Sequence, residues 1–148
     1  MKTIWQDDVR RELGDRLTKL TPTNRAQWGK MSAPEMVCHL AESLKMTMGE
    51  LPCVARPSPL RRAPLKQFII FIAPWPKGVP TAPELLARVP ASWSNDLLEL
   101  NALVDRVAAR RNDAPGWPEH PAFGKLSARA WGRLVYRHID HHLRQFGA

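Results

Sequence analysis

The residues from Ser127 to Phe146 constrain the fold most, because their charged and uncharged side chains separate onto two sides of a helix. At about 100° per residue, Trp131, His138 and His142 fall near one line along that helix. The opposite side carries the charged residues Arg129, Arg133, Arg137, Asp140 and Arg144. Because burying these charges would cost a large free energy, the side with the two histidines must face the core.

His138 and His142 are four residues apart, which places their Cβ atoms about 5–6 Å from each other on one helix. Both imidazoles could therefore reach one metal ion. The alternative is that they are core histidines held by hydrogen bonds, and the spacing alone favours this interpretation. His141 points to the flank, where it can support the site by hydrogen bonding. Ile139 stands where a metalloprotease of the H-E-x-x-H type has its glutamate.

A second helix is predicted to start at Ser32-Ala-Pro-Glu35, a capping box with proline in the first turn. On this helix His39 and Glu42 share one side, and Ala41, Lys45 and Met48 point away from it. His39 therefore faces the core and is the natural third metal ligand, since a helical bundle brings facing side chains together. Glu42 has three possible roles: it can orient an imidazole, act as a base, or reach solvent at the end of the bundle.

The remaining long periodic segments also have the helical period. One runs from Ile4 to about Leu20 and another from Ala91 to about Arg111. Between them, residues 51–80 contain seven prolines and form a long crossover with a short helix at about 62–73. A second capping box is expected at Thr81-Ala-Pro-Glu84. The sequence thus predicts an all-α, four-helix bundle with a long crossover between helices two and three, and one domain over 1–148.

Composition restricts the compartment and the partners. The two cysteines, Cys38 and Cys53, make a disulfide framework improbable, and the N-terminus has no signal-peptide pattern, so a cytoplasmic protein is expected. The longest apolar run, Phe68 to Ala73, is too short to span a membrane. We expect the stretch from Phe68 to Trp75 to be covered by the protein's own helices or by a second copy in a homodimer.

The net charge of +8 would favour nucleic acid, an anionic membrane or a small anionic substrate, and charge alone does not choose between them. Part of the excess is local, because residues 51–83 contain no acidic side chain and carry Arg56, Arg61, Arg62, Lys66 and Lys77. A solvated basic surface would explain the same charge. No nucleic-acid reader motif accompanies it, which disfavours nucleic-acid binding. A small anionic substrate would suit a basic surface.

Several motifs together resemble the DinB/YfiT-like superfamily of metal-dependent enzymes, within a branch of unknown function. They are Trp28, Ser32 and His39-Leu-Ala-Glu42, then His120-Pro-Ala-Phe-Gly-Lys-Leu126, Trp131 and His138-Ile-Asp-His-His-Leu-Arg-Gln-Phe146. The resemblance spans nearly the whole chain except residues 51–80. Ala122 departs from it, at a position where a second aromatic residue is expected.

The resemblance implies a divalent metal, zinc or nickel, held by His39, His138 and His142, with His120 and His141 outside the ligand set. It also implies one of two activities. In an S-transferase, the metal would activate a low-molecular-weight thiol as co-substrate, and in a hydrolase it would activate water. The alternative is a non-catalytic metal-binding or stress-response protein, because one fold can host many functions.

Overall fold

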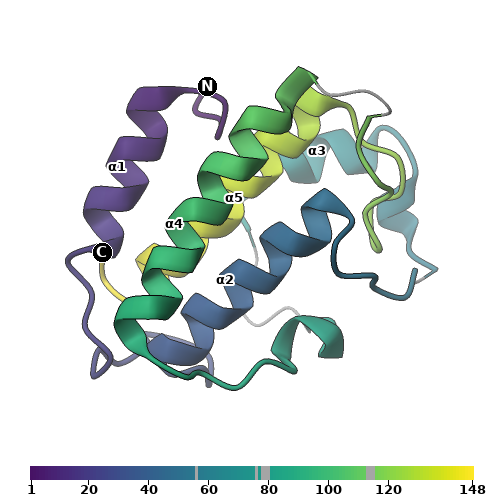
Figure 1. The fold of residues 1–148 in the computed structure, drawn as a ribbon. Coiled ribbons are helices and arrows are strands. Elements are labelled where there is room, and N and C mark those ends of the chain that lie inside the picture. Colours follow the sequence, from purple (N-terminus) through teal and green to yellow (C-terminus); the bar gives the residue numbers. More distant parts are fainter. Residues whose placement is uncertain (56, 76, 78–80, 113–115) are drawn as a thin grey trace.

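The computed structural model describes residues 1–55, 57–75, 77, 81–112 and 116–148 (Figure 1). The expectations that involve Arg56, Pro76 and the residues 113–115 of the loop before the last helix lie outside this range. The described residues form five α-helices: α1 (Asp7–Leu17), α2 (Ala33–Met48), α3 (Leu65–Phe71), α4 (Trp93–Ala109) and α5 (Ala128–Gln145). The described part of the chain contains no strand, so the all-α prediction is confirmed.

Local capping sets where α2 and α5 begin. The Ser32 and Glu35 side chains form the predicted capping box, with Ser32 N–H donating to Glu35 Oε2 at 2.7 Å. At α5, the Ser127 hydroxyl accepts from the Ala130 amide at 3.2 Å. The capping box predicted at Thr81 is wrong: Pro83–Leu86 is a 3₁₀ turn without a side-chain cap, and Glu84 Oε1 accepts instead from the Val54 amide.

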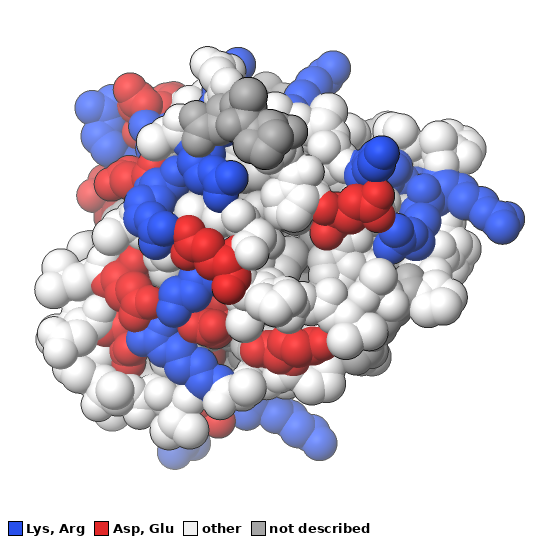
Figure 2. Space-filling model, turned by 45° about the vertical axis from the view of Figure 1, so that its right-hand side comes forward, with Lys and Arg blue, Asp and Glu red and all other residues white. Residues whose placement is uncertain are grey.

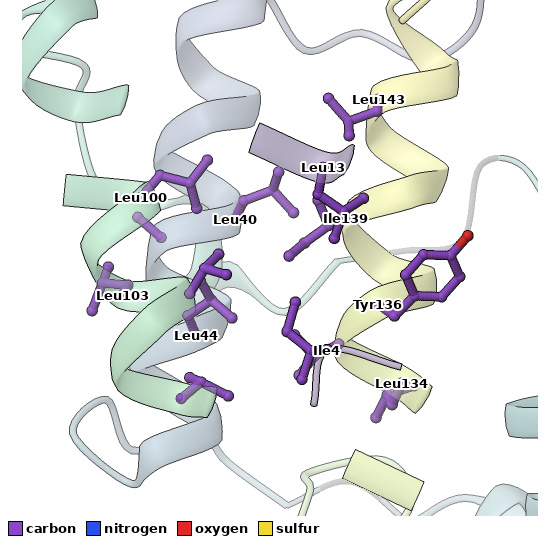
Figure 3. Packing of buried hydrophobic residues seen from close by; sticks show 14 of the residues in the cluster. Ile4, Leu13, Leu40, Leu44, Leu100, Leu103, Leu134, Tyr136, Ile139 and Leu143 are labelled. Carbon is purple, nitrogen blue, oxygen red and sulfur yellow. The ribbon is translucent and has the colours of Figure 1, made fainter. Parts of the chain in front are cut away.

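The four longer helices lie close together: α2 packs against both α4 and α5, and α1 also packs against both of them (Figure 1). Their apolar sides meet in one core, where leucines such as Leu40 and Leu100 face Ile139 from α5 (Figure 3). Ala41 and Met48, which are expected to point away from His39, are buried as well. The reason is that α2 is covered on several sides, by α4, by α5 and by the 3₁₀ turn Pro83–Leu86.

The charged side of α5 is covered more than its composition suggests. Arg137 lies under α3, where its guanidinium donates to the carbonyls of Ile69, Ile70 and Ala73 near the C-terminal end of that helix. Asp140 is paired with Arg16 of α1 at 2.8 Å. These partners offset the cost of removing the charges from water, so α5 is held by neighbours on both of its sides.

The apolar residues around α3 are only partly covered. Ile70 is fully buried and Ala73 is buried, but Phe68 is 49% exposed and Ile72 is 71% exposed. The protein's own helices therefore leave part of the stretch uncovered, because α3 has only seven residues and packs on α5 with one side. Coverage by a second copy stays a prediction.

Gly132 of α5 allows the N-terminal segment to pack against the helix. A Cβ at this position would lie 2.1 Å from Trp5 Nε1, whose N–H donates to the Ala128 carbonyl. We expect Gly132→Ala to lower the free energy of unfolding by about 1–3 kcal/mol, because the indole ring must leave its place. Urea denaturation measures this change.

Gly14→Ala is the matched control, since the nearest atom to its added Cβ is 3.9 Å away. This helical site has room for the methyl group, so Gly14→Ala should raise stability by roughly 0.5–1 kcal/mol. Equal stability changes in the two variants would show that the Trp5 contact does not matter.

Candidate metal centre

Three histidine side chains from two helices converge in the structure. His39 comes from α2, and His138 and His142 come from successive turns of α5. His138 Nε2 lies 3.0 Å from His39 Nε2 and 3.2 Å from His142 Nε2. His39 and His142 are buried and His138 is partly exposed, so the cluster opens on the His138 side.

The remaining ring nitrogens of two of these histidines are held by acceptors. His39 Nδ1 lies 3.3 Å from the Leu85 carbonyl oxygen, and His142 Nδ1 lies 2.7 Å from Gln145 Oε1. The Gln145 amide donates to the Trp28 carbonyl at 2.6 Å, which leaves its oxygen to accept from His142. Both Nδ1 atoms therefore carry the proton, and both Nε2 atoms present a lone pair to the cluster.

Glycine at position 29 makes the Gln145 contact possible. Its φ is +83°, and a Cβ there would lie 2.6 Å from Gln145 Nε2. The loop after α1 can thus approach the end of α5 closely enough for the amide to reach the Trp28 carbonyl.

A divalent cation fits this arrangement. Without a cation, His138 Nε2 can carry one proton and can donate it to only one of its two neighbours, His39 Nε2 or His142 Nε2. The lone pair of the other neighbour then faces His138 without a proton between the two nitrogens, which is unfavourable. Nitrogens about 2.0–2.1 Å from one cation lie about 2.9 Å apart at right angles and about 3.3 Å apart in a tetrahedron, and the two distances from His138 Nε2, 3.0 and 3.2 Å, fall between these values. All three ligand nitrogens lie within 4.8 Å of one another.

The three imidazoles are also in the protonation state that a metal needs. Burial, followed by the neighbouring histidines, holds the pKa of His138 well below its usual range. Burial lowers the pKa of His39, and it lowers the pKa of His142 to about 3. The three-histidine cluster could therefore bind a divalent metal through neutral rings.

His141 lies outside this cluster, against aromatic rings. Its centroid is 5.7 Å from that of Trp28, 5.8 Å from that of Trp75 and 5.3 Å from that of His142. Trp75 also lies 5.7 Å from His138. The sequence pattern did not mark Trp75 as part of the site, because it belongs to the proline-rich crossover, where no helical period assigns it a direction.

Glu42 lies on the same helix as His39, and its described contacts are ion pairs. Glu42 Oε1 is 3.0 Å from Lys45 Nζ and 3.5 Å from Arg88 Nη1. These two cations also pair with Glu99, at 2.8 and 2.7 Å. Glu42 is thus buried in a network of charges that joins α2 to α4, beside the turn that carries Leu85.

His120 belongs to the loop before α5 and lies apart from the cluster. Its Nδ1 accepts from the amides of Ala122 and Phe123, and its ring packs 5.4 Å from that of Trp131. A β-bridge between His120 and Gly124 closes the loop. This histidine therefore organises the loop, a role that could not be assigned from the residue pattern alone.

Acid should destabilise the protein through His120. Burial, with a smaller effect of Arg61, lowers its pKa to about 4, whereas in the unfolded chain a histidine titrates near 6.5. The unfolded state binds more protons between these values, so stability is lost as the pH falls from 6.5 through 4. We expect protonation of His120 to lower the free energy of unfolding of the metal-free protein by up to about 3 kcal/mol. Urea denaturation at each pH measures this change.

The variant His120→Asn separates this effect from the titration of the cluster. Its amide oxygen can accept from the same backbone amides but takes up no proton. The stability of the variant should fall less steeply with acid than that of the wild type. Identical slopes would assign the acid sensitivity to other histidines.

Residues 8–148 match the family described as "Protein of unknown function (DUF1569)". No curated protein and no solved structure matches the chain. Among the described residues, no helix is both long and apolar enough to cross a membrane. Since the match covers almost the whole sequence, the chain belongs to the DUF1569 family of proteins of unknown function.

Proposed function

We propose that this protein is a metal-dependent enzyme whose divalent metal, zinc or nickel, is held by His39, His138 and His142. The convergence of three Nε2 atoms, with two of the Nδ1 protons directed to Leu85 and Gln145, is the observation that carries the proposal. Three neutral protein ligands also leave coordination positions for a substrate or water, as catalytic zinc sites require.

The proposal includes the fold type and the class of reaction. We assign the four longer helices to a four-helix bundle of the DinB/YfiT-like type, in which α3 belongs to the crossover between helices two and three. The reaction class is transfer to a low-molecular-weight thiol, or hydrolysis. A bound divalent metal would supply the acidity that converts a thiol or water into a nucleophile near neutral pH.

The chain's own residues would orient and shield the site. Leu85 and Gln145 fix the rotation of two imidazoles, which such partners do at many metal sites. Trp75 packs beside His138, where it would exclude water from the more exposed side of the cluster.

The expected substrate is small and anionic, in keeping with the net charge of +8. On the face shown in Figure 2, Lys and Arg side chains are interleaved with Asp and Glu. This face offers no continuous basic strip of the kind that follows a nucleic-acid backbone.

Metal analysis and a thiol screen test the proposal. Protein purified without a histidine tag should contain about one divalent metal ion per chain, and should catalyse transfer of an electrophile to one of a panel of thiols or hydrolyse it. Metal without activity across the panel would favour a non-catalytic metal-binding or stress-response protein. Protein that neither holds nor takes up metal would refute the proposal.

We include Glu42 in the proposal as a catalytic residue that assists the site without ligating the metal. Glu42→Gln is expected to keep stoichiometric metal and to lose activity by about 100-fold, the range typical of a general acid or base. Metal content and turnover, measured on the same preparation, test this.

Glu99→Gln is the control for Glu42, because Glu99 pairs with the same two cations, Lys45 and Arg88. Equal losses of activity in both variants would mean that Glu42 acts through the charge network. Loss of metal from Glu42→Gln would make Glu42 a ligand or a structural partner.

A further inference from the structure

We infer that Trp28, Trp75 and Lys77 form a binding wall for a small anion with a flat apolar body, next to the three-histidine cluster. The inference rests on the proposed function, since it specifies which substrates would reach that metal. Its ligand class is an aromatic or unsaturated carboxylate, or a thiol that carries such a group. We call these three residues the tryptophan wall.

One indole ring lies beside the most exposed histidine of the cluster, and the other is joined to it through His141. Trp75 is 5.7 Å from the ring of His138, the partly exposed member of the cluster, and 5.8 Å from that of His141. Trp28 lies 5.7 Å from His141, so the His141 ring contacts both tryptophans. Both indoles are themselves partly exposed, which leaves aromatic surface for a flat ligand to stack on.

The chain brings these rings together from distant segments. Trp28 belongs to the loop between α1 and α2, and its carbonyl is held by Gln145. Trp75 follows α3, whose end is fixed to α5 by the Arg137 guanidinium, itself 5.7 Å from the Trp75 ring. Both indoles are thus anchored through α5, the helix that supplies two histidines of the cluster.

The indole N–H groups lack acceptors. Trp28 Nε1 and Trp75 Nε1 are both buried, and neither has a hydrogen-bond partner among the described residues. A buried donor without an acceptor is unfavourable, and native proteins contain few of them. A ligand carboxylate or carbonyl that enters beside a slightly shifted ring would supply the missing acceptor.

The local charge selects an anion. Lys77 Nζ lies 4.1 Å from the centroid of Trp28, and Lys77 is exposed. The three histidines are neutral ligands, so a divalent metal would keep its full positive charge beside this wall. The nearby carboxylate of Asp140 is already paired with Arg16 and Arg144. An anionic group of the ligand would therefore be attracted and not repelled.

The test compares two thiols that differ in charge, 3-mercaptobenzoate and 3-mercaptobenzyl alcohol. Each is titrated by calorimetry into zinc-loaded protein whose zinc content has been measured beforehand. We expect Trp75→Leu to weaken both thiols by about 10-fold, because both stack on the ring. Lys77→Met should weaken only the anionic thiol, by about 3- to 10-fold, and added salt should weaken wild-type binding of the same thiol.

Controls separate the tryptophan wall from the metal site. Lys125→Met removes an exposed lysine that precedes the N-terminus of α5, and should leave both affinities unchanged. Trp75→Phe keeps an aromatic surface and should bind nearly as well as wild type, which guards against a Trp75→Leu variant that fails to fold.

Each outcome decides a different claim. Full zinc content with unchanged thiol affinities in Trp75→Leu and Lys77→Met would overturn the tryptophan wall and leave the metal site standing. A protein that takes up no zinc would overturn the proposed function, and this inference with it. Equal effects of Lys77→Met on both thiols would refute the role of charge.

Discussion

Alanine in place of His39, His138 or His142 is expected to lower metal affinity by a factor on the order of 100 or more, which empties the site in purified protein. Each side chain contributes one of three nitrogens that lie within 4.8 Å of one another. Loss of any one leaves two imidazole ligands, which are too few to hold the metal ion against buffer and water molecules that also bind it. Metal content by mass spectrometry and affinity by competition with a chelator measure the effect.

His141→Ala is the matched control, because His141 is the immediate neighbour of His142 on the same helix but lies outside the cluster. This variant should keep most of its metal. If His141→Ala emptied the site while His138→Ala or His142→Ala did not, the assignment of ligands on α5 would be wrong. Metal binding should also weaken as the pH falls, because protons compete for the same nitrogen lone pairs.

Asp96→Ala is expected to lower the free energy of unfolding by about 3 kcal/mol, the range observed when one partner of a buried ion pair is removed. Asp96 is 3% exposed and pairs with Arg88. It also accepts from the amides of Ala91 and Ser92, at 3.2 Å each, where α4 begins. The variant would leave the partly buried Arg88 and two backbone donors with weaker partners. Urea denaturation with the metal chelated measures the loss.

Glu99→Ala tests whether removing any carboxylate of the same network costs as much stability as removing Asp96. Its side chain is 37% exposed and pairs with Arg88 and Lys45, so its removal should cost about 1 kcal/mol or less. Equal losses for Asp96→Ala and Glu99→Ala would contradict the special role of the buried carboxylate.

The Asp96 variant should also affect the metal centre. Arg88 follows the turn Pro83–Leu86, and the Leu85 carbonyl in that turn accepts from His39. A looser turn would hold the His39 ring less firmly, so metal affinity should fall together with stability.

The sequence by itself determined the helices and the directions of the histidines along them. Ser32 and Ser127 mark where α2 and α5 begin, because capping depends on residues within one turn. The helical period places His138 and His142 on one side of α5, and His39 on the side of α2 that meets them. These features could be predicted because each is decided by neighbours along the chain.

Only the tertiary structure decided what surrounds those histidines. The Leu85 carbonyl that fixes His39, the Trp28 carbonyl that fixes Gln145, and Trp75 beside His138 all come from segments without a regular period. The same is true of Arg137, whose charge is satisfied by carbonyls at the end of α3. Periodicity gives the direction of a side chain about its own helix axis, whereas these contacts depend on how distant segments pack together.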